Sequence, residues 1–463
     1  KKNITISYED DLLNEIWEDR PALSDAKAFL LDIKYSGEDF TNKIARVREW
    51  MRENNTTTHI LTSLDDIAWL FNIRGGDIKY NPVVLSYAVI TLDKAILFVD
   101  ENKLNDEIKT SFGEEVVEIK NYFEIYEFVK TINKEEIVLI DSNKISYSIL
   151  KNIPAGVKVV NGMNPSTKFK AQKNSVEIEN TKKAHIRDGV AVTKFMYWLK
   201  NNIGKIEITE LSAADKITEL RREQGKFIEE SFGTIAGYAS NGAIIHYSVT
   251  KESNTTLKDR GLFLLDSGGQ YFDGTTDITR TFALGELTKE EKYHFTTVAR
   301  AMIRLSDVKF LHGVNGYYLD ILARGILWNE GLNYNHGTGH GVGHVLNVHE
   351  GPNGFRLDNK ESAILEEGMI TTNEPGFYKA GSHGIRLENE MLCVKGEKNE
   401  FGQFMEFEPI TIAPIDLDAI NVELMKEDEK AYLNEYHKIV FDTVSPFLTT
   451  EETNWLKEYT RAI

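Results

Sequence analysis

A carboxylate at the end of a very apolar segment is the sequence feature that most constrains the fold. Asp266 follows the apolar run from Leu262 to Leu265, which predicts a buried strand. A charge placed there is costly unless something cationic receives it. Asp277 lies eleven residues further on, in a second strand pattern. A gap this short fits two strands joined by a tight turn, with both carboxylates facing one spot.

Two further carboxylates lie in segments whose backbone conformation the neighbouring residues indicate. Glu374 is followed by Pro375 and Gly376, which fix the chain beyond it. Glu388 belongs to a segment that alternates like a strand, and Arg386 precedes it by two positions. Residues two apart on a strand share a face, so we expect this arginine and this glutamate to point the same way.

A glycine-rich stretch over residues 336–352 holds most of the imidazole groups that could act in a site. It contains His336, His340, His344 and His349, the first three spaced by four. That spacing would place three rings on one helix face. However, glycine occupies alternate positions, and each one costs a helix roughly 1 kcal/mol. We therefore expect a loop that approaches something closely, such as a metal cluster.

The charges of these side chains suggest that they form a metal site. Four carboxylates and one neutral imidazole balance two divalent cations, and the predicted ligands are Asp266, Asp277, His340, Glu374 and Glu388. Oxygen-rich ligation with one histidine suits manganese, cobalt or iron, and zinc is also compatible. An isolated aspartate after a strand is more often a turn or cap residue, and a lone histidine more often structural. Only the combination favours a two-metal hydrolase.

Other catalytic motifs are absent from the sequence. The pair His349-Glu350 is followed by Gly351-Pro352 with no second histidine, so the zincin motif HExxH is missing. We find neither a phosphate-binding Walker A loop nor a GxSxG nucleophile elbow. The single cysteine, Cys393, excludes intramolecular disulfides and cysteine-rich zinc sites, and it fits a reducing compartment.

The pattern along the 463 residues predicts two domains. Over residues 1–170, strands mixed with helices indicate an α/β domain without a cluster of potential ligands. Residues 165–173 are polar and without periodicity, so we place the boundary there. Asn174 with Glu177 then resembles a capping box that starts a long helix. Residues 171–463 combine glycine-rich strands, two further helices and a helical tail from about 418.

The net charge is −18, from 54 Lys and Arg against 72 Asp and Glu. Such a chain repels phosphate backbones and anionic lipids, so we expect no nucleic acid and no membrane partner. No apolar run reaches the ~18 residues that a membrane span requires. No signal peptide is visible, although the chain begins with Lys1 rather than methionine. A cytoplasmic location is the prediction.

Several motifs together resemble the aminopeptidase P family, the metal-dependent Xaa-Pro aminopeptidases with a pita-bread catalytic fold. They are NGAIIHY, LLDSGGQYFDGTTDITRT, HGTGHGVGHVLNVHEGP, NEPGFY and GIRLENE. The segments TSLDDIAWLFNIRG and FEPITIAPID are similar to the middle domain and C-terminal extension of the three-domain, eukaryotic-type branch. The resemblance implies a creatinase/prolidase-like α/β domain over 1–170 and a pita-bread domain over 171–463. It also implies that the first domain of that branch is missing.

The same resemblance implies the roles of the metal ligands. Asp277 is expected to bind one metal through both oxygens, with His340 beside it. Asp266 and Glu388 are expected to bridge toward the second metal, and Glu374 to complete the set. A hydroxide held between two metal ions is the implied nucleophile. Manganese is the expected metal, with cobalt, iron or zinc as alternatives.

Further residues carry implied catalytic and binding roles. Glu374 is expected to shuttle the proton of the nucleophile, and His349 to steady the oxyanion. His246 resembles a partner of the substrate carbonyl or of the leaving side. Three residues resemble those that line the proline side of the substrate cleft in this family: His336, Tyr378 and Arg386.

The implied function is release of the N-terminal residue from peptides with proline at position 2. An Xaa-Pro bond has no N–H to donate, so a pocket for the pyrrolidine ring has to supply selectivity instead. The alternatives are a prolidase that cuts Xaa-Pro dipeptides and a catalytically inactive pita-bread binding module. The family further implies a homodimer.

Overall fold

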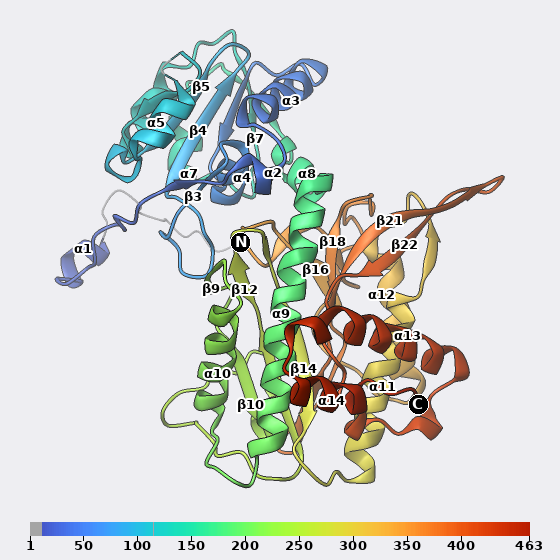
Figure 1. Ribbon diagram of the computed structural model, residues 1–463. Helices are drawn as coiled ribbons and strands as arrows, with labels where there is room; N and C mark the ends of the chain where they lie inside the picture. Colours follow the sequence, from blue (N-terminus) through green and yellow to red (C-terminus); the bar gives the residue numbers. More distant parts are fainter. Residues whose placement is uncertain (1–11, 114) are drawn as a thin grey trace, which may run out of the picture.

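The computed structural model describes residues 12–113 and 115–463, and it contains a smaller N-terminal and a larger C-terminal domain (Figure 1). The N-terminal domain is built on a six-stranded sheet in the order β6-β5-β4-β2-β7-β8. Its strands are β2 (Thr58–Leu61), β4 (Ser86–Thr91), β5 (Ala95–Val99), β6 (Glu118–Lys120), β7 (Ile137–Ile140) and β8 (Lys158–Asn161). Parallel and antiparallel pairs both occur in this sheet. The mixed α/β pattern predicted for this half is therefore confirmed.

Local sequence signals account for the elements of this domain. Strand β2 is followed directly by α4 (Leu64–Leu70). α3 (Phe40–Glu53) begins where Asp39 caps it, since the side chain of Asp39 accepts the N–H of Thr41. Ile44, Val47 and Met51 form the buried face of this helix.

The segment expected to be an irregular boundary is helical instead. α8 (Pro165–Ala171) begins with a proline, which suits the first turn of a helix. It packs against α4 and against β17 (Glu350–Phe355) of the other domain. These tertiary contacts stabilise a helix that its polar sequence does not suggest. The capping box predicted next is confirmed, since Asn174 and Glu177 cap α9 (Ser175–Asn202) reciprocally.

The C-terminal domain places its strands between two pairs of helices (Figure 1). One pair is α9 with α10 (Glu210–Glu223), and the other is α11 (Lys289–Ser306) with α12 (Gly316–Asn329). A three-stranded sheet has the order β10-β11-β14 and a six-stranded sheet the order β15-β22-β21-β18-β16-β17. The expected helical tail is confirmed as α13 (Glu427–Val444) and α14 (Thr450–Tyr459), which pack on α9.

The strand that carries Asp266 is as buried as predicted. β11 (Leu262–Ser267) is fully buried and pairs antiparallel with β14 (Ile278–Ala283), with Asp266 opposite Thr279. The link between these strands is not a single tight turn. It forms a small hairpin of β12 (Gly269–Tyr271) and β13 (Gly274–Thr275). β12 also pairs with β9 (Phe227–Glu230), so the residues that connect β11 to β14 belong to a second sheet. β11 and β14 themselves remain neighbours in the first sheet.

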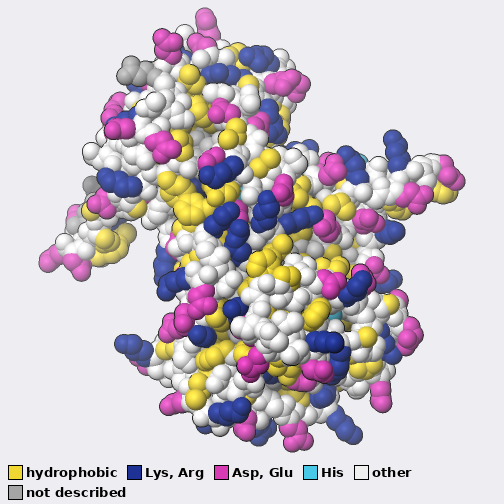
Figure 2. Space-filling model, viewed as in Figure 1, with side chains coloured by type: hydrophobic (Ala, Val, Ile, Leu, Met, Phe, Trp, Pro, Cys, Tyr) yellow, Lys and Arg dark blue, Asp and Glu magenta, His cyan; other side chains and the backbone are white. Residues whose placement is uncertain are grey.

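Positive and negative side chains are interspersed over most of the face shown in Figure 2. None of the helices in the described ranges has the length and apolar character to cross a membrane.

Candidate metal centre and substrate cleft

A cavity of about 720 Å³ opens in the C-terminal domain. All predicted site residues except Tyr378 line it: His246, Asp266, Asp277, His336, His340, His349, Glu374, Arg386 and Glu388. They come from at least five separate segments of the chain, so only the fold brings them together. Phe232, Ile235 and Ile245 add apolar surface to the same walls.

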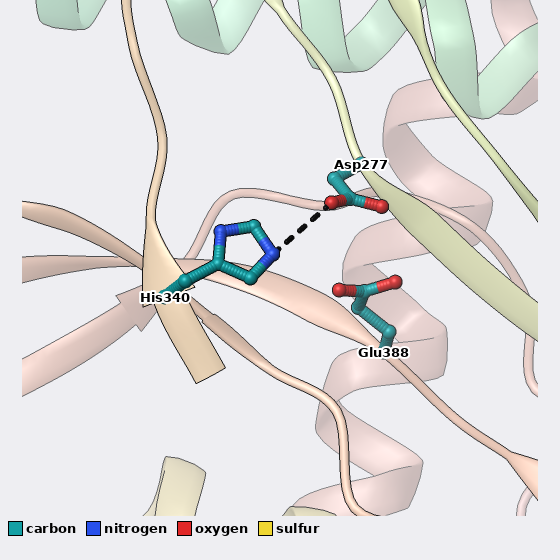
Figure 3. A group of neighbouring side chains, drawn as sticks. All are labelled: Asp277, His340 and Glu388. Carbon is teal, nitrogen blue, oxygen red and sulfur yellow. Dashed lines mark ion pairs between the residues drawn. The ribbon is translucent and has the colours of Figure 1, made fainter. Parts of the chain in front are cut away.

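Three of the predicted ligands converge on one point (Figure 3). Asp277, His340 and Glu388 each offer one donor atom, and these atoms lie within 4.8 Å of one another. The Nε2 atom of His340 is 3.4 Å from Oδ2 of Asp277. Asp277 immediately precedes β14, His340 lies in β16 (Gly339–Gly341), and Glu388 lies between β20 (His383–Arg386) and β21 (Asn389–Asn399).

The other two predicted ligands border this cluster. Oε1 of Glu374 is 3.8 Å from Nε2 of His340. Oδ2 of Asp266 accepts a 2.6 Å hydrogen bond from Arg386, while its Oδ1 is buried and has no hydrogen-bond partner within the described ranges. A buried carboxylate oxygen without a donor is unfavourable, and a bound cation would satisfy it.

Hydrogen bonds fix the orientation of the His340 ring. Its Nδ1 is 2.9 Å from the carbonyl oxygen of Gly341, and because a carbonyl can only accept, Nδ1 carries the proton. Nε2 therefore presents its lone pair to the carboxylates. A second-sphere carbonyl that sets the tautomer in this way is typical of metal-binding histidines. The backbone N–H of His340 is held by Thr372 Oγ1 at 3.0 Å.

The glycines around His340 are needed for strand packing. A Cβ atom on Gly339 would lie 1.8 Å from the carbonyl oxygen of Thr372, and one on Gly341 2.1 Å from that of Glu350. The close approach that the glycine pattern predicted is thus made to the backbone of neighbouring strands.

Burial and mutual repulsion raise the pKa values of the carboxylates. Burial, followed by Asp266 and Glu374, raises the pKa of Asp277 well above its usual range, and the pKa of Glu388 is raised for similar reasons. Burial also raises the pKa of Glu374 to about 6, although His340 and Arg386 oppose the shift. Carboxylates this crowded fit divalent cations, and one imidazole among oxygen donors matches the chemistry of manganese, iron, cobalt or zinc.

Residues that the sequence reasoning missed support the ligands. Thr279 donates to Oε2 of Glu388 at 2.7 Å. Glu390 accepts the backbone N–H of Asp277 at 2.8 Å and lies 3.1 Å from buried His185. Strand alternation could have indicated two of them, because Thr279 and Glu390 each stand two positions from a predicted ligand.

A hydrogen-bonded chain forms one wall of the cleft. Arg386 donates to the hydroxyl of Tyr378 at 2.7 Å, and that hydroxyl lies 2.9 Å from Nε2 of His336. The Nδ1 of His336 is 2.7 Å from the carbonyl oxygen of Gly337, so Nδ1 donates and Nε2 accepts from the tyrosine. Burial, reinforced by Arg386, lowers the pKa of His336 to about 3, which keeps its ring neutral. Tyr378 therefore sits behind the lining and joins the two residues that face the cavity.

Two further predicted residues, His349 and His246, line the same cavity as the candidate ligands. The ring of His349 lies 4.3 Å from that of His340, between centroids. Loss of water within the cleft, followed by the charge of His340, lowers the pKa of His349 to about 4, although the residue as a whole remains exposed. His246 lies in an exposed turn after the short helix Ala239–Ala243. By contrast, buried His344 contacts Thr181 and the backbone of Tyr35, which agrees with a structural role.

Family models match three successive segments of the chain. Residues 19–177 match the creatinase/prolidase N-terminal domain, residues 179–395 metallopeptidase family M24, and residues 403–463 the C-terminal region of that peptidase family. These matches confirm the predicted fold class, a creatinase/prolidase-like domain followed by a pita-bread domain. The proposed boundary between residues 170 and 171 stays a prediction.

Relatives and solved structures agree with these matches. A probable Xaa-Pro aminopeptidase P of Leptosphaeria maculans is 38% identical and aligns with 98% of this chain and 78% of its own length. One from Coprinopsis cinerea is 39% identical over 100% of this chain and 78% of its length. An X-prolyl aminopeptidase from Caenorhabditis elegans, described as a cytosolic enzyme with a di-nuclear active site, superposes with a TM-score of 0.93 at 34% identity, covering 98% of this chain and 76% of that one.

A prolidase from Pyrococcus horikoshii shares the fold alone, with a TM-score of 0.64 and 23% identity over 81% of this chain and 99% of its own. The relatives that match nearly the whole chain at higher identity are aminopeptidases. The chain therefore belongs to the Xaa-Pro aminopeptidase P family of M24 metallopeptidases.

Proposed function

We propose that this protein is a dinuclear metallopeptidase that removes the N-terminal residue from peptides with proline at position 2. The observation that carries the proposal is a single cavity lined by the five candidate ligands and by His336 and Arg386, which Tyr378 joins from behind. The di-nuclear site described for the similar nematode enzyme supports it.

The metal ligands in this proposal are the residues whose donor atoms crowd the cavity: Asp266, Asp277, His340, Glu374 and Glu388. Two divalent cations there would activate a water nucleophile and polarise the scissile carbonyl. Manganese is our first choice, and cobalt, iron and zinc are compatible with the same donors. The unpartnered Oδ1 of Asp266 supports its role as a ligand.

Three side chains then handle protons and charge during hydrolysis. Glu374, which lines the cavity beside His340, accepts the proton of the attacking water and delivers it to the leaving proline nitrogen. His349 is neutral at physiological pH and donates an N–H to the developing oxyanion. His246, which lines the same cavity, contacts the substrate carbonyl or the leaving side.

In this proposal, selectivity for proline follows from the shape of the cleft surface that receives the pyrrolidine ring. The tertiary amide of an Xaa-Pro bond offers no N–H, so recognition depends on the surface that accommodates the ring. His336 and Arg386 provide part of that surface, and Tyr378 holds both in place.

Replacing Tyr378 with phenylalanine tests this wall. Loss of the hydroxyl removes one acceptor of Arg386 and the donor to Nε2 of His336, while their bonds to Asp266 and to the Gly337 carbonyl remain, so the wall should loosen. We expect KM for an Xaa-Pro tripeptide to rise about tenfold, with a smaller change in kcat. The matched control is Tyr293→Phe, which removes an exposed hydrogen bond to Glu330. Equal KM values in both variants would contradict the assignment of the wall.

A peptide panel with simultaneous metal analysis tests the proposed function itself. We expect hydrolysis of an Xaa-Pro tripeptide after the first residue and none of a matched tripeptide with alanine in place of proline. Cleavage of Xaa-Pro dipeptides alone would instead identify a prolidase. Absence of both bound metal and turnover, even with added manganese, would identify an inactive binding module.

A homodimer and a cytoplasmic location complete the proposal. The description of the nematode enzyme as cytosolic supports the second of these. The acidic net charge of −18 supports peptide substrates over nucleic acid or membrane partners.

A further inference from the structure

The loop between His340 and His349 is anchored in the other domain. Leu346 is 1% exposed and packs within a hydrophobic core whose other buried members all lie between Ala28 and Val117. The carbonyl of Leu346 also accepts a 2.7 Å hydrogen bond from Gln270. One residue of the catalytic loop is therefore part of the core of the N-terminal domain.

Polar side chains of the N-terminal domain bind the same loop. Arg74, which is buried, donates to the carbonyl oxygens of Val345 at 2.5 Å and His344 at 3.1 Å. Asp65 accepts the backbone N–H of Asn347 at 3.0 Å. Val345 has φ of 53°, a conformation that β-branched residues rarely adopt. Such a conformation persists only where the surroundings hold it, and Arg74 binds the carbonyl of this residue.

The far end of the loop is fixed as well. Glu350 is buried and pairs with Lys170 and Lys173, both at 2.8 Å. His349 thus lies between two anchored positions, Asn347 and Glu350. No hydrogen bond to its ring is found among residues 12–113 and 115–463, so the backbone and the contact with His340 decide where the ring points.

We propose that Asp65 and Arg74 of the N-terminal domain are positioning residues for His349. They hold the backbone of residues 344–347 so that the imidazole faces the reacting carbonyl. The inference rests on the proposed function, because it assigns these residues to the step in which His349 stabilises the oxyanion. It makes the N-terminal domain part of the catalytic apparatus, although neither residue touches the substrate.

The first test compares Asp65→Ala with Asp65→Asn. Alanine removes the acceptor for the N–H of Asn347, whereas asparagine keeps an oxygen there. We expect kcat for an Xaa-Pro tripeptide to fall roughly tenfold in the alanine variant with little change in KM, and asparagine to restore most of it. Arg74→Lys, which keeps the charge and can reach one carbonyl, undergoes the same assays in case Asp65→Ala does not fold.

A double-mutant cycle separates positioning from a merely structural role. If Asp65 acts through His349, Asp65→Ala should have little further effect on kcat in a His349→Ala background. The matched control is Glu229→Ala, because Glu229 accepts the N–H of Tyr80 at 3.1 Å across the same domain interface without contacting the loop. Independent effects that multiply, or an equal loss of kcat in the Glu229 variant, would overturn the proposal.

Hydrogen exchange provides a readout that needs no turnover. Amides of residues 344–350 should exchange faster in Asp65→Ala than in the wild-type protein, and unchanged exchange would overturn the positioning role. If the wild-type protein failed to cleave Xaa-Pro peptides, the proposed function would fall, whereas faster exchange would still show that Asp65 holds the loop.

Discussion

Replacing Asp277 with asparagine is expected to lower kcat by a factor on the order of 1,000, about 4 kcal/mol of activation free energy, without unfolding the protein. In our proposal Asp277 supplies oxygen donors at the point where His340 and Glu388 converge. An amide lacks the negative charge that balances the cations, so metal content should fall together with turnover.

The fold should survive this substitution for an electrostatic reason. Burial and the neighbouring carboxylates disfavour the charged form of Asp277, as its raised pKa shows. A neutral side chain removes that repulsion, so the metal-free variant should melt no lower than the metal-free wild type. Circular dichroism, metal analysis and steady-state kinetics check these expectations. Asp259→Asn is the matched control, since Asp259 is exposed. Near-normal turnover by the Asp277 variant would contradict the ligand assignment.

Removal of metal by a chelator is expected to abolish hydrolysis, and added manganese to restore it. The same treatment should lower Tm, and the loss should be larger at about pH 7.5 than at about pH 5. Metal binding to the folded protein stabilises it, and protons compete with metal ions for the carboxylates.

The sign of this pH dependence follows from Glu374. Its pKa is raised from 4.5 to about 6 in the folded protein, so the folded state binds a proton that the unfolded state releases. Without metal, the contribution of this carboxyl group to stability is therefore fully present below about pH 4.5 and is lost as the pH rises through about 6. Asp277 and Glu388, whose pKa values are also raised, act in the same direction. Calorimetry at both pH values measures the effect, and an equal Tm loss at both would contradict it.

Much of the metal centre is predictable because its chemistry is local. A carboxylate after the buried run Leu262–Leu265 is costly unless a cation receives it, and the structure places Asp266 at that strand end beside the cavity. Alternation likewise places Arg386 and Glu388 on one side, and both line the cavity. Charge balance then suggests how many cations such a set could hold.

The remainder depends on contacts between distant segments. Nothing near Tyr378 in the sequence shows that its hydroxyl joins Arg386 to His336, 42 positions away. The polar segment around Pro165 becomes a helix because it packs between α4 and β17. The sequence pattern correctly predicts that Gly339 and Gly341 closely approach other atoms. Those atoms belong to the backbones of neighbouring strands, and the sequence alone does not show which strands become neighbours.

The placement of Leu346 in the core of the other domain also affects how such proteins can be recombined. An exchange of N-terminal domains between relatives would have to preserve the socket that receives this side chain, and the acceptor and donor groups of Asp65 and Arg74 with it. Otherwise a hybrid could retain all candidate metal ligands and all histidine and tyrosine side chains of the cleft and still hydrolyse Xaa-Pro peptides slowly. With Asp65 and Arg74 as the proposed positioning residues, the functional module of this protein is larger than the domain that lines the cavity.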